Sequence, residues 1–296
     1  MTKVLVIGGT RFFGKKLVQR LIHDQADITI LTRGTTPDPF GDSVKRLQVN
    51  RTDRTALSQA LGSMSFDVVY DNICFTAQEA EDAVHLFAGR TDKYIVTSSL
   101  SVYPFGEGRK RESDFDPYSY PLPETYPGKD DYAEGKRLVE AVLFQKAPFS
   151  VAAVRFPIVL GHDDYTRRLH FHVEHIQQGQ PLGIPNPKAF LSFIHSDEAA
   201  AFLAWLGHSQ LQGSVNACAQ GETSPGKIVS LIEQALHTQA QVMQETEPEH
   251  RSPFGIPRPW YMDTAKAEAA GFVFEQLDDW LPRLIQEIAA QSSASY

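Results

Sequence analysis

The chain has 296 residues, 42% hydrophobic and 22% charged, a balance typical of a globular protein with one large core or two smaller ones. Its net charge of −8, from 28 basic and 36 acidic residues, argues against a broad basic face for nucleic-acid backbones. With only two cysteines we predict no disulfide framework, and without an apolar run of ~20 residues we predict no membrane span. Strand-like sequence begins at once, which predicts that there is no targeting segment, so we expect a cytoplasmic protein.

The first half of the chain alternates β-branched runs with segments of helical apolar spacing. We predict strands at residues 4–7, 28–31, 44–49, 67–70, 93–97 and 151–156, and helices at residues 13–22, 55–61, 77–87 and 132–144. Strands that alternate with helices in this way form right-handed βαβ units. We therefore predict an α/β fold, a Rossmann-type doubly wound parallel sheet with its ligands at the carboxyl ends of the strands.

The second half is less regular. Residues 101–128 are rich in Pro, Tyr, Gly and charge, and we predict a long loop of the kind that often forms a lid or a substrate wall. Further helices are predicted at residues 169–178, 196–206, 225–236 and 281–290, with connections at 181–187 and 248–259. We predict an NAD(P)-binding domain at 1–160, to which 190–218 returns, and a smaller C-terminal substrate-binding domain made of 161–189 and 219–296.

The segment GGTRFFG lies between the first predicted strand and the first predicted helix. Gly8 allows a tight turn, and Gly14 allows the helix to pack close to the sheet. The N–H groups and positive dipole of the helix N-terminus then face a pyrophosphate. A glycine-rich turn that binds nothing is the alternative, because any tight strand-to-helix turn favours glycine. Its place at the first βα turn favours a dinucleotide site.

Two arginines predict which dinucleotide is bound. Thr32 and Arg33 follow the second predicted strand, where an NAD-binding loop has Asp or Glu for the ribose hydroxyls. A guanidinium there can bind a 2′-phosphate in bidentate fashion, and Arg11 can reach the same phosphate. We predict NADP as the cofactor, with NAD as the alternative; the simpler interpretation is that both arginines are surface residues.

A Tyr-x-x-x-Lys pair in a predicted helix carries the catalytic hypothesis. Tyr132 and Lys136 share one helical face. A lysine ammonium beside a tyrosine favours the phenolate, so that the phenol can exchange a proton with a carbonyl or alcohol. Alone, the pair could be an amphipathic surface pair. Hydroxyl side chains also gather at the end of the preceding predicted strand, at Thr97, Ser98, Ser99 and Ser101. A serine there can hydrogen-bond the reacting oxygen.

With these motifs the chain resembles the short-chain dehydrogenase/reductase superfamily, in the extended form that includes nucleotide-sugar epimerases and dehydratases. The pattern Ser-Ser-x-x-Val-Tyr is matched by residues 98–103, which makes Ser99 the family's catalytic hydroxyl beside Tyr132 and Lys136. RFPIVLG at 155–161 resembles the segment that closes over the nicotinamide, and FIHSDEAAAF at 193–202 resembles the family's Phe-Ile-His-x-x-Asp segment. The resemblance covers nearly the whole chain.

The glycine motif departs from the family's Gly-x-x-Gly-x-x-Gly, because Arg11 replaces the middle glycine. The Gly-Gly-x-x-x-x-Gly form resembles an atypical subgroup of poorly defined activity, with members described as reductase-like, dehydratase-like or RNA-binding. Leu100, not Glu, follows Ser99, which disfavours a dehydratase. The resemblance implies that the residues contacting the cofactor are Gly8, Gly9, Thr10, Arg11, Phe12, Phe13, Gly14, Arg33, Asn50, Arg51, Asn72, Ile73, Thr97, Tyr132, Lys136, Phe156, Pro157 and Val159.

The substrate is expected to be a small molecule, in one version a nucleotide sugar. Candidate substrate contacts are Ser101, Tyr103, Arg167 and Arg168, the two arginines lying where nucleotide-sugar members bind a diphosphate. Four histidines follow the nicotinamide segment, but they lack a convincing metal spacing, and we predict no metal.

We therefore predict an NAD(P)-dependent oxidoreductase of the extended short-chain type, working as a monomer or homodimer through Ser99, Tyr132 and Lys136. A nucleotide-sugar epimerase with a tightly bound cofactor is the first alternative. From another class, an RNA-binding or regulatory module that keeps a cofactor site is the second, although the acidic charge disfavours nucleic acid.

Overall fold

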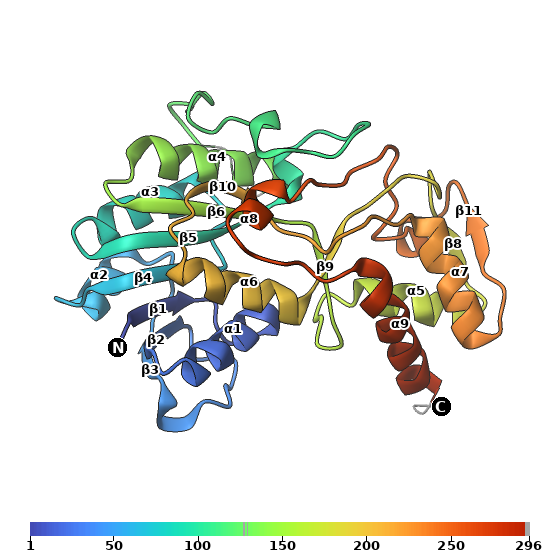
Figure 1. Ribbon diagram of the computed structural model, residues 1–296, viewed down its shortest axis with the longest axis horizontal. Helices are drawn as coiled ribbons and strands as arrows, with labels where there is room; N and C mark the ends of the chain where they lie inside the picture. Colours follow the sequence, from blue (N-terminus) through green and yellow to red (C-terminus); the bar gives the residue numbers. More distant parts are fainter. Residues whose placement is uncertain (127, 129, 294–296) are drawn as a thin grey trace.

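A computed structural model describes residues 1–126, 128 and 130–293 of the chain (Figure 1). Pro127 of the predicted long loop and residues 294–296 of the predicted C-terminal domain lie outside the described residues. Seven strands form the main sheet: β1 (Lys3–Ile7), β2 (Asp27–Thr32), β3 (Lys45–Gln48), β4 (Phe66–Asp71), β5 (Thr91–Ser99), β6 (Ser150–Phe156) and β10 (Gly213–Asn216).

All neighbouring strands of this sheet are parallel, in the order β10-β6-β5-β4-β1-β2-β3. The predicted doubly wound α/β fold is thus confirmed. The strand order reverses between β1 and β4, and ligands of such sheets bind outside the carboxyl ends of the strands at this switch point. The loops that follow Ile7 and Asp71 therefore adjoin the expected binding crevice.

Helices cover both faces of the sheet (Figure 1). One face packs against α1 (Phe12–His23) and α6 (Ser196–His208), and its buried side chains form one hydrophobic cluster around Val6 and Phe202. The other face packs against α2 (Arg54–Leu61), α3 (Ala77–Phe87) and α4 (Tyr132–Lys146), with a second cluster around Leu5 and Val139. Burial on both faces explains why central strands such as β1 and β4 are largely apolar.

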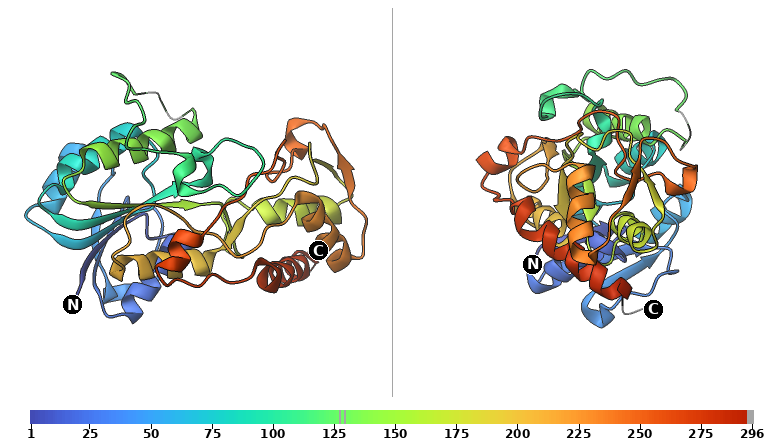
Figure 2. Two further views of the ribbon diagram at one scale, coloured as in Figure 1. Left: turned by 45° about the horizontal axis from the view of Figure 1, so that its top comes forward. Right: turned by 90° about the vertical axis from the view of Figure 1, so that its right-hand side faces the viewer.

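The C-terminal elements lie beyond one end of the sheet (Figure 2). They surround a third hydrophobic cluster that includes Trp280 and Ile285. The elements are β7 (Ile158–Leu160), α5 (Arg168–Gln177), β8 (Pro181–Gly183), β9 (Phe193–His195), α7 (Pro225–Leu236), β11 (Gln241–Met243) and α9 (Leu277–Ser293). Helix α8 (Ala265–Ala269) instead lies beside β10 (Figure 1), and its Ala267 belongs to the first cluster. Strands β7 and β9 pair with each other, as do β8 and β11. We keep the division into two domains as a proposal.

The structure differs from the sequence prediction chiefly in its short elements. Strands β7 to β11 and helix α8 were not predicted, because segments of three to five residues are too short to show a periodic pattern. Strand β8 lies inside the predicted connection 181–187, and α9 begins at Leu277 instead of residue 281. Short 3₁₀ helices lie at Gly41–Ser43, Leu100–Val102, Glu112–Asp114 and Pro248–His250; the third lies within the predicted long loop, and the second overlaps its start.

Candidate functional site

The glycine loop brings α1 very close to the sheet. Gly8 has a φ of +82°, and a Cβ there would lie 2.7 Å from Ile73 Cγ2. A Cβ on Gly14 would lie 2.2 Å from the carbonyl oxygen of Gly8, so no larger residue fits without moving the helix. Both glycines are thus required by the backbone path that was expected of a dinucleotide loop.

The N-terminus of α1 carries no capping side chain. Arg11 is the N-cap residue, its side chain makes no capping hydrogen bond, and the first turn holds no acidic residue. The free N–H groups and the positive end of the helix dipole are therefore left for an anion, which fits the pyrophosphate of a dinucleotide. Phe12 adopts a left-handed φ of +50°, which is uncommon for a residue with a Cβ.

Arg11 extends from this loop toward the end of β2. Its Nε and Nη2 donate to Thr36 Oγ1 over 3.2 and 3.0 Å, and its guanidinium carbon lies 5.8 Å from the Tyr165 ring centre. Arg33, just after β2, is exposed to solvent. The structure thus brings Arg11 next to the segment that carries Arg33, which is the arrangement a shared 2′-phosphate would need.

A chain of polar contacts crosses the switch point. Asn72 follows β4; its N–H donates to Ile7 O over 3.0 Å, and its side-chain amide donates to Gly8 O at 3.5 Å. Its side-chain oxygen accepts from Thr97 Oγ1 over 2.8 Å. The ends of β1, β4 and β5 are therefore joined by predicted cofactor-contacting residues.

Arg51 is engaged inside the protein. Its Nη1 donates to both carboxylate oxygens of Asp71 over 2.7 Å, and Tyr94 donates to the same carboxylate over 2.5 Å. Burial opposes the charge, but Asp71 outweighs it and raises the pKa of Arg51. The guanidinium therefore acts first as an internal counterion, and only its buried Nε lacks a partner among the described residues. Asn50 is exposed.

Lys136 is the centre of the predicted catalytic group. It is 1% exposed, and its ammonium donates to the carbonyl oxygens of Thr97 over 2.7 Å and Cys74 over 2.8 Å. The nitrogen lies 4.7 Å from the ring centre of Phe75 and 5.8 Å from that of Tyr132. Helix α4 therefore carries this cation to the ends of β4 and β5, beside a tyrosine that is 50% exposed.

Gly135 is a close-packing position beside the candidate site that the sequence motifs did not reveal. A Cβ at Gly135 would lie 2.6 Å from the carbonyl oxygen of Phe75. The glycine lets α4 approach the loop after β4, which brings Lys136 within reach of Cys74 O. A glycine inside an otherwise favourable helix is the signal that could have revealed it, because it costs helix stability unless packing requires it.

Ser99 is the last residue of β5. Its Oγ accepts the N–H of Ser101 over 3.1 Å, so its own hydrogen remains to be donated. Ser101 is buried, and its hydroxyl has no partner among the described residues. Tyr103, by contrast, is 2% exposed; its hydroxyl accepts from Arg155 and donates to Asn216, each over 2.7 Å. The Tyr103 hydroxyl is therefore engaged inside the protein, and its contact with a substrate stays a proposal.

The predicted nicotinamide segment crosses from β6 to β7. Phe156 is buried, with its ring centre 5.8 Å from that of Phe13 in α1. Pro157 separates the two strands, and Val159 is buried in β7. This segment therefore packs beside the glycine loop.

The two arginines proposed as diphosphate contacts lie at the start of α5. Arg167 has a left-handed φ of +54° and forms an ion pair with Glu174 of the same helix. The backbone N–H of Arg168 donates to Asp164 over 3.3 Å. The guanidinium of Arg167 is already paired with Glu174 and would have to leave it to bind a diphosphate. The substrate roles of Arg167 and Arg168 stay proposals.

The histidines of α5 do not converge on a metal. Burial lowers the pKa of His172 to about 4, and its Nε2 lies 2.6 Å from Ser252 Oγ. Across residues 1–126, 128 and 130–293, no three His, Cys, Asp or Glu side chains are placed to hold a metal ion. The same residues include no helix long and apolar enough to span a membrane.

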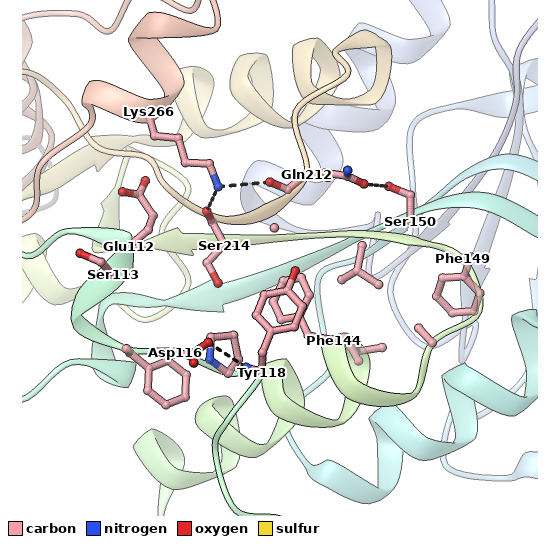
Figure 3. Close-up of a pocket in the computed structure, with 16 residues that line it drawn as sticks. Glu112, Ser113, Asp116, Tyr118, Phe144, Phe149, Ser150, Gln212, Ser214 and Lys266 are labelled. Atoms are coloured by element: carbon pink, nitrogen blue, oxygen red, sulfur yellow. Dashed lines mark hydrogen bonds between the residues drawn. The ribbon is translucent and has the colours of Figure 1, made fainter.

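A cavity of about 600 Å³ lies away from this group, at the amino ends of β6 and β10 (Figure 3). Ser150 and Ser214 contribute to its lining, together with Tyr118 and Phe144 from the opposite side. Lys266 donates to the backbone carbonyls of Gln212 and Ser214, over 3.2 and 2.7 Å. The cavity is therefore separate from the carboxyl-end residues considered above.

Residues 4–218 match the model of the NAD dependent epimerase/dehydratase family. Among curated proteins, the chain is 26% identical over 223 residues to the chloroplast stem-loop binding protein of 41 kDa b of Arabidopsis thaliana, and 27% identical over 99 residues to the 2'-dehydrokanamycin reductase of Streptomyces kanamyceticus. These alignments cover 70% and 33% of this chain but 56% and 28% of the relatives, so the chain spans only part of their length.

Among solved structures, the UDP-glucose 4-epimerase of Thermus thermophilus, in complex with NAD, is similar with a TM-score of 0.73 at 16% identity, over 97% of this chain and 98% of that chain. MoeE5, in complex with UDP-glucuronic acid and NAD, gives a TM-score of 0.73 at 19% identity, over 98% and 99%. At such identities the similarity establishes the fold.

Proposed function

The chain belongs to the NAD-dependent epimerase/dehydratase family, and from this premise we propose that it is an NAD(P)-dependent oxidoreductase acting on a carbonyl or hydroxyl group of a small molecule. The observation that carries the proposal is the placement of Lys136. Its ammonium is buried at the ends of β4 and β5, beside Tyr132. It bonds the carbonyl oxygen of Thr97, which is two residues before Ser99 in β5. Among the described residues this buried ammonium has no carboxylate partner, which would be a costly feature in a protein that only needed a stable fold.

The uncapped helix N-terminus, the two close-packed glycines and the Asn72–Thr97 contact support a dinucleotide at the switch point. When bound, its nicotinamide supplies a centre that accepts or donates hydride. Gly8 and Gly14 keep α1 close to the sheet, so that the N–H groups of its first turn would hold the pyrophosphate of a bound dinucleotide. Arg11 and Arg33 support NADP over NAD, because Arg33 and not Asp or Glu stands directly after β2, and both guanidinium groups flank the same segment.

The chain's own residues would move the proton. Tyr132 exchanges a proton with the substrate oxygen, and the Lys136 ammonium, 5.8 Å from the ring centre of Tyr132, stabilises negative charge that develops on the reacting oxygens. Ser99 Oγ already accepts the N–H of Ser101, so its hydrogen can be donated to that oxygen and orient it.

Within this class, a nucleotide-sugar epimerase that retains its cofactor is the main alternative. Two solved structures of similar fold are named as epimerases of UDP-sugars, whereas one curated relative is named as a reductase. Liquid chromatography and mass spectrometry of the denatured, freshly purified chain separate the two. A stoichiometric nucleotide that survives gel filtration supports an epimerase, and a chain that is empty but binds added NADPH supports a reductase.

A nucleic-acid-binding role is the second candidate, since one relative is named as a stem-loop binding protein. The net charge of −8 disfavours it, because nonspecific RNA affinity depends on neutralised phosphates. Filter binding of a labelled RNA stem-loop at about 150 mM salt tests it. Retention there, combined with no binding of either dinucleotide, would replace the enzyme proposal.

A further inference from the structure

Three residues of α4 form one stripe that faces the sheet. Tyr132, Lys136 and Glu140 follow each other at intervals of four residues, so they share a helical face. Lys136 bonds the carbonyl oxygen of Thr97, and Glu140 accepts a hydrogen bond from the hydroxyl of Ser98. The helix is thus attached to two consecutive residues of β5, directly before Ser99.

Glu140 is completely buried and forms an ion pair with an equally buried Arg155 of β6. Arg155 Nη2 donates to Glu140 Oε2 over 2.6 Å, and its Nε donates to Oε1 over 3.0 Å. Ser214 of β10 donates to Oε2 over 3.0 Å. One carboxylate therefore joins α4 to three neighbouring strands, β5, β6 and β10.

The other side of Arg155 holds the segment that follows Ser99. Its Nη1 donates to Tyr103 Oη over 2.7 Å and to Glu112 O over 3.0 Å, and its Nη2 donates to Phe115 O over 3.1 Å. The guanidinium carbon lies 4.9 Å from the ring centre of Tyr103. The first part of the Pro-rich loop is thereby fixed to the same ion pair as the helix that carries Tyr132.

Stability alone does not explain this arrangement. Two fully buried charges lose their hydration, and well-packed apolar residues of similar volume often replace such a pair with no loss of stability. What apolar residues cannot replace is the directional set of bonds to Ser98, Ser214 and Tyr103. These bonds, together with that of Lys136 to Thr97, set the register of α4 against β5, so that the helix cannot slide along the strand without breaking them.

We propose that Glu140, together with Arg155, is a positioning pair that sets the place of Tyr132 relative to Ser99 and ties the loop after Ser99 to the catalytic helix. The proposal rests on the proposed function, since it assigns these residues to the same site. Neither residue touches the reacting atoms. They act through the Ser98–Glu140 bond and through the backbone of α4.

The test compares Glu140→Leu/Arg155→Met with wild type. The double variant removes both charges together, so no unpaired buried charge remains and we expect it to fold. Its melting temperature should be lower than that of wild type, because the hydroxyls of Ser98 and Ser214 and the carbonyl oxygens of Glu112 and Phe115 lose these partners. The readout is the ¹³Cζ signal of Tyr132 in ring-labelled protein, assigned with Tyr132→Phe. We expect the double variant to displace this signal, because the ring changes its position relative to Lys136. A folded double variant with the wild-type signal would overturn the proposal.

Two further variants keep the test decisive. If the double variant does not fold, Ser98→Ala removes only the bond between β5 and Glu140 and leaves the ion pair in place; a displaced Tyr132 signal supports the proposal and an unchanged one overturns it. The control Glu81→Gln/Lys146→Gln removes an ion pair that joins α4 to α3, and it must leave the signal in place. All signals are recorded without cofactor. Failure of wild type to bind NADPH or NADH therefore counts against the proposed function and not against the positioning role.

Discussion

The ammonium of Lys136 donates a 2.7 Å hydrogen bond to the carbonyl oxygen of Thr97, two residues before Ser99 in the same strand. The same nitrogen bonds Cys74 O at the end of β4. A single buried cation therefore relates helix α4 to the two strands beside the switch point. This relationship places the predicted acid–base residues at the carboxyl end of the sheet.

Lys136→Met removes the cation while keeping an unbranched apolar side chain. Two buried carbonyl oxygens lose their donor, so we expect the free energy of unfolding to fall by about 1–3 kcal/mol. Turnover should fall by roughly 100-fold or more, because the phenol loses its neighbouring charge. Chemical denaturation measures the first effect and absorbance of the reduced nicotinamide the second. Lys146→Met, on the same helix, should leave turnover unchanged; wild-type turnover in Lys136→Met would remove the residue from the mechanism.

Gly135→Ala separates helix propensity from packing. Alanine favours an isolated helix by about 1 kcal/mol, so propensity alone predicts a more stable protein. The added Cβ would lie 2.6 Å from the carbonyl oxygen of Phe75, and α4 must move to relieve that contact. We expect a lower melting temperature and weaker cofactor binding. A variant with a raised melting temperature would show that the close approach of α4 is not needed.

Arg33→Asp should change cofactor preference. A carboxylate at this position repels a 2′-phosphate and can accept the ribose hydroxyls of NAD. We expect the ratio of the NADPH and NADH dissociation constants, measured by fluorescence titration, to move at least tenfold toward NADH. Arg20→Asp makes the same change of charge at an exposed position in the last turn of α1, away from the glycine loop, and serves as the control. An unchanged ratio would place the phosphate elsewhere, and Arg11→Ala would then be expected to lower NADPH affinity.

Glu198 predicts a pH-dependent stability. It lies in α6, 5% exposed, with one carboxylate oxygen accepting the N–H of Glu275 and the other without a partner among the described residues. Burial raises its pKa to about 7, above the ~4.3 of an unfolded chain. Between these values the folded state binds the additional proton, so this residue's contribution to stability falls as pH rises from about 4.3 to about 7.

Glu198→Gln keeps the shape without the charge. We expect the variant to gain stability over wild type between pH 5 and pH 8, and the difference to shrink toward pH 5, as measured by urea denaturation at each pH. Glu249→Gln, at an exposed position, should track wild type throughout. A difference between Glu198→Gln and wild type that is constant across this window would contradict the assignment.

The sequence predicted the parts of the molecule that depend on local patterns. Apolar runs and helical spacing located the βαβ units of the Rossmann-type half, because each run is long enough to show its period. The motif around Tyr132 was readable for the same reason, since both residues lie in one helix. The short strands β7 to β11 contain three or four residues and show no period.

Other features could not be predicted because they arise only when distant segments pack together. Tyr103 is the last residue of the family motif at 98–103, which suggests a contact with substrate. Its hydroxyl is nevertheless buried against Arg155, 52 residues away in sequence. Arg51 looks like a cofactor contact, but the fold brings Asp71 to it. The ion pair of Glu140 and Arg155 is likewise invisible in sequence, since neither residue belongs to a pattern that implies a partner.

The central claim is that this chain uses a nicotinamide dinucleotide at the carboxyl ends of β1, β4 and β5. Isothermal titration of NADPH and NADH into the purified chain, after removal of any bound nucleotide, tests it most directly, with the melting temperature recorded in parallel. We predict saturable binding of NADPH, weaker binding of NADH, and about 2.7 kcal/mol of stabilisation when the ligand is at 100 times its Kd. No heat of binding and an unchanged melting temperature with both dinucleotides would contradict it.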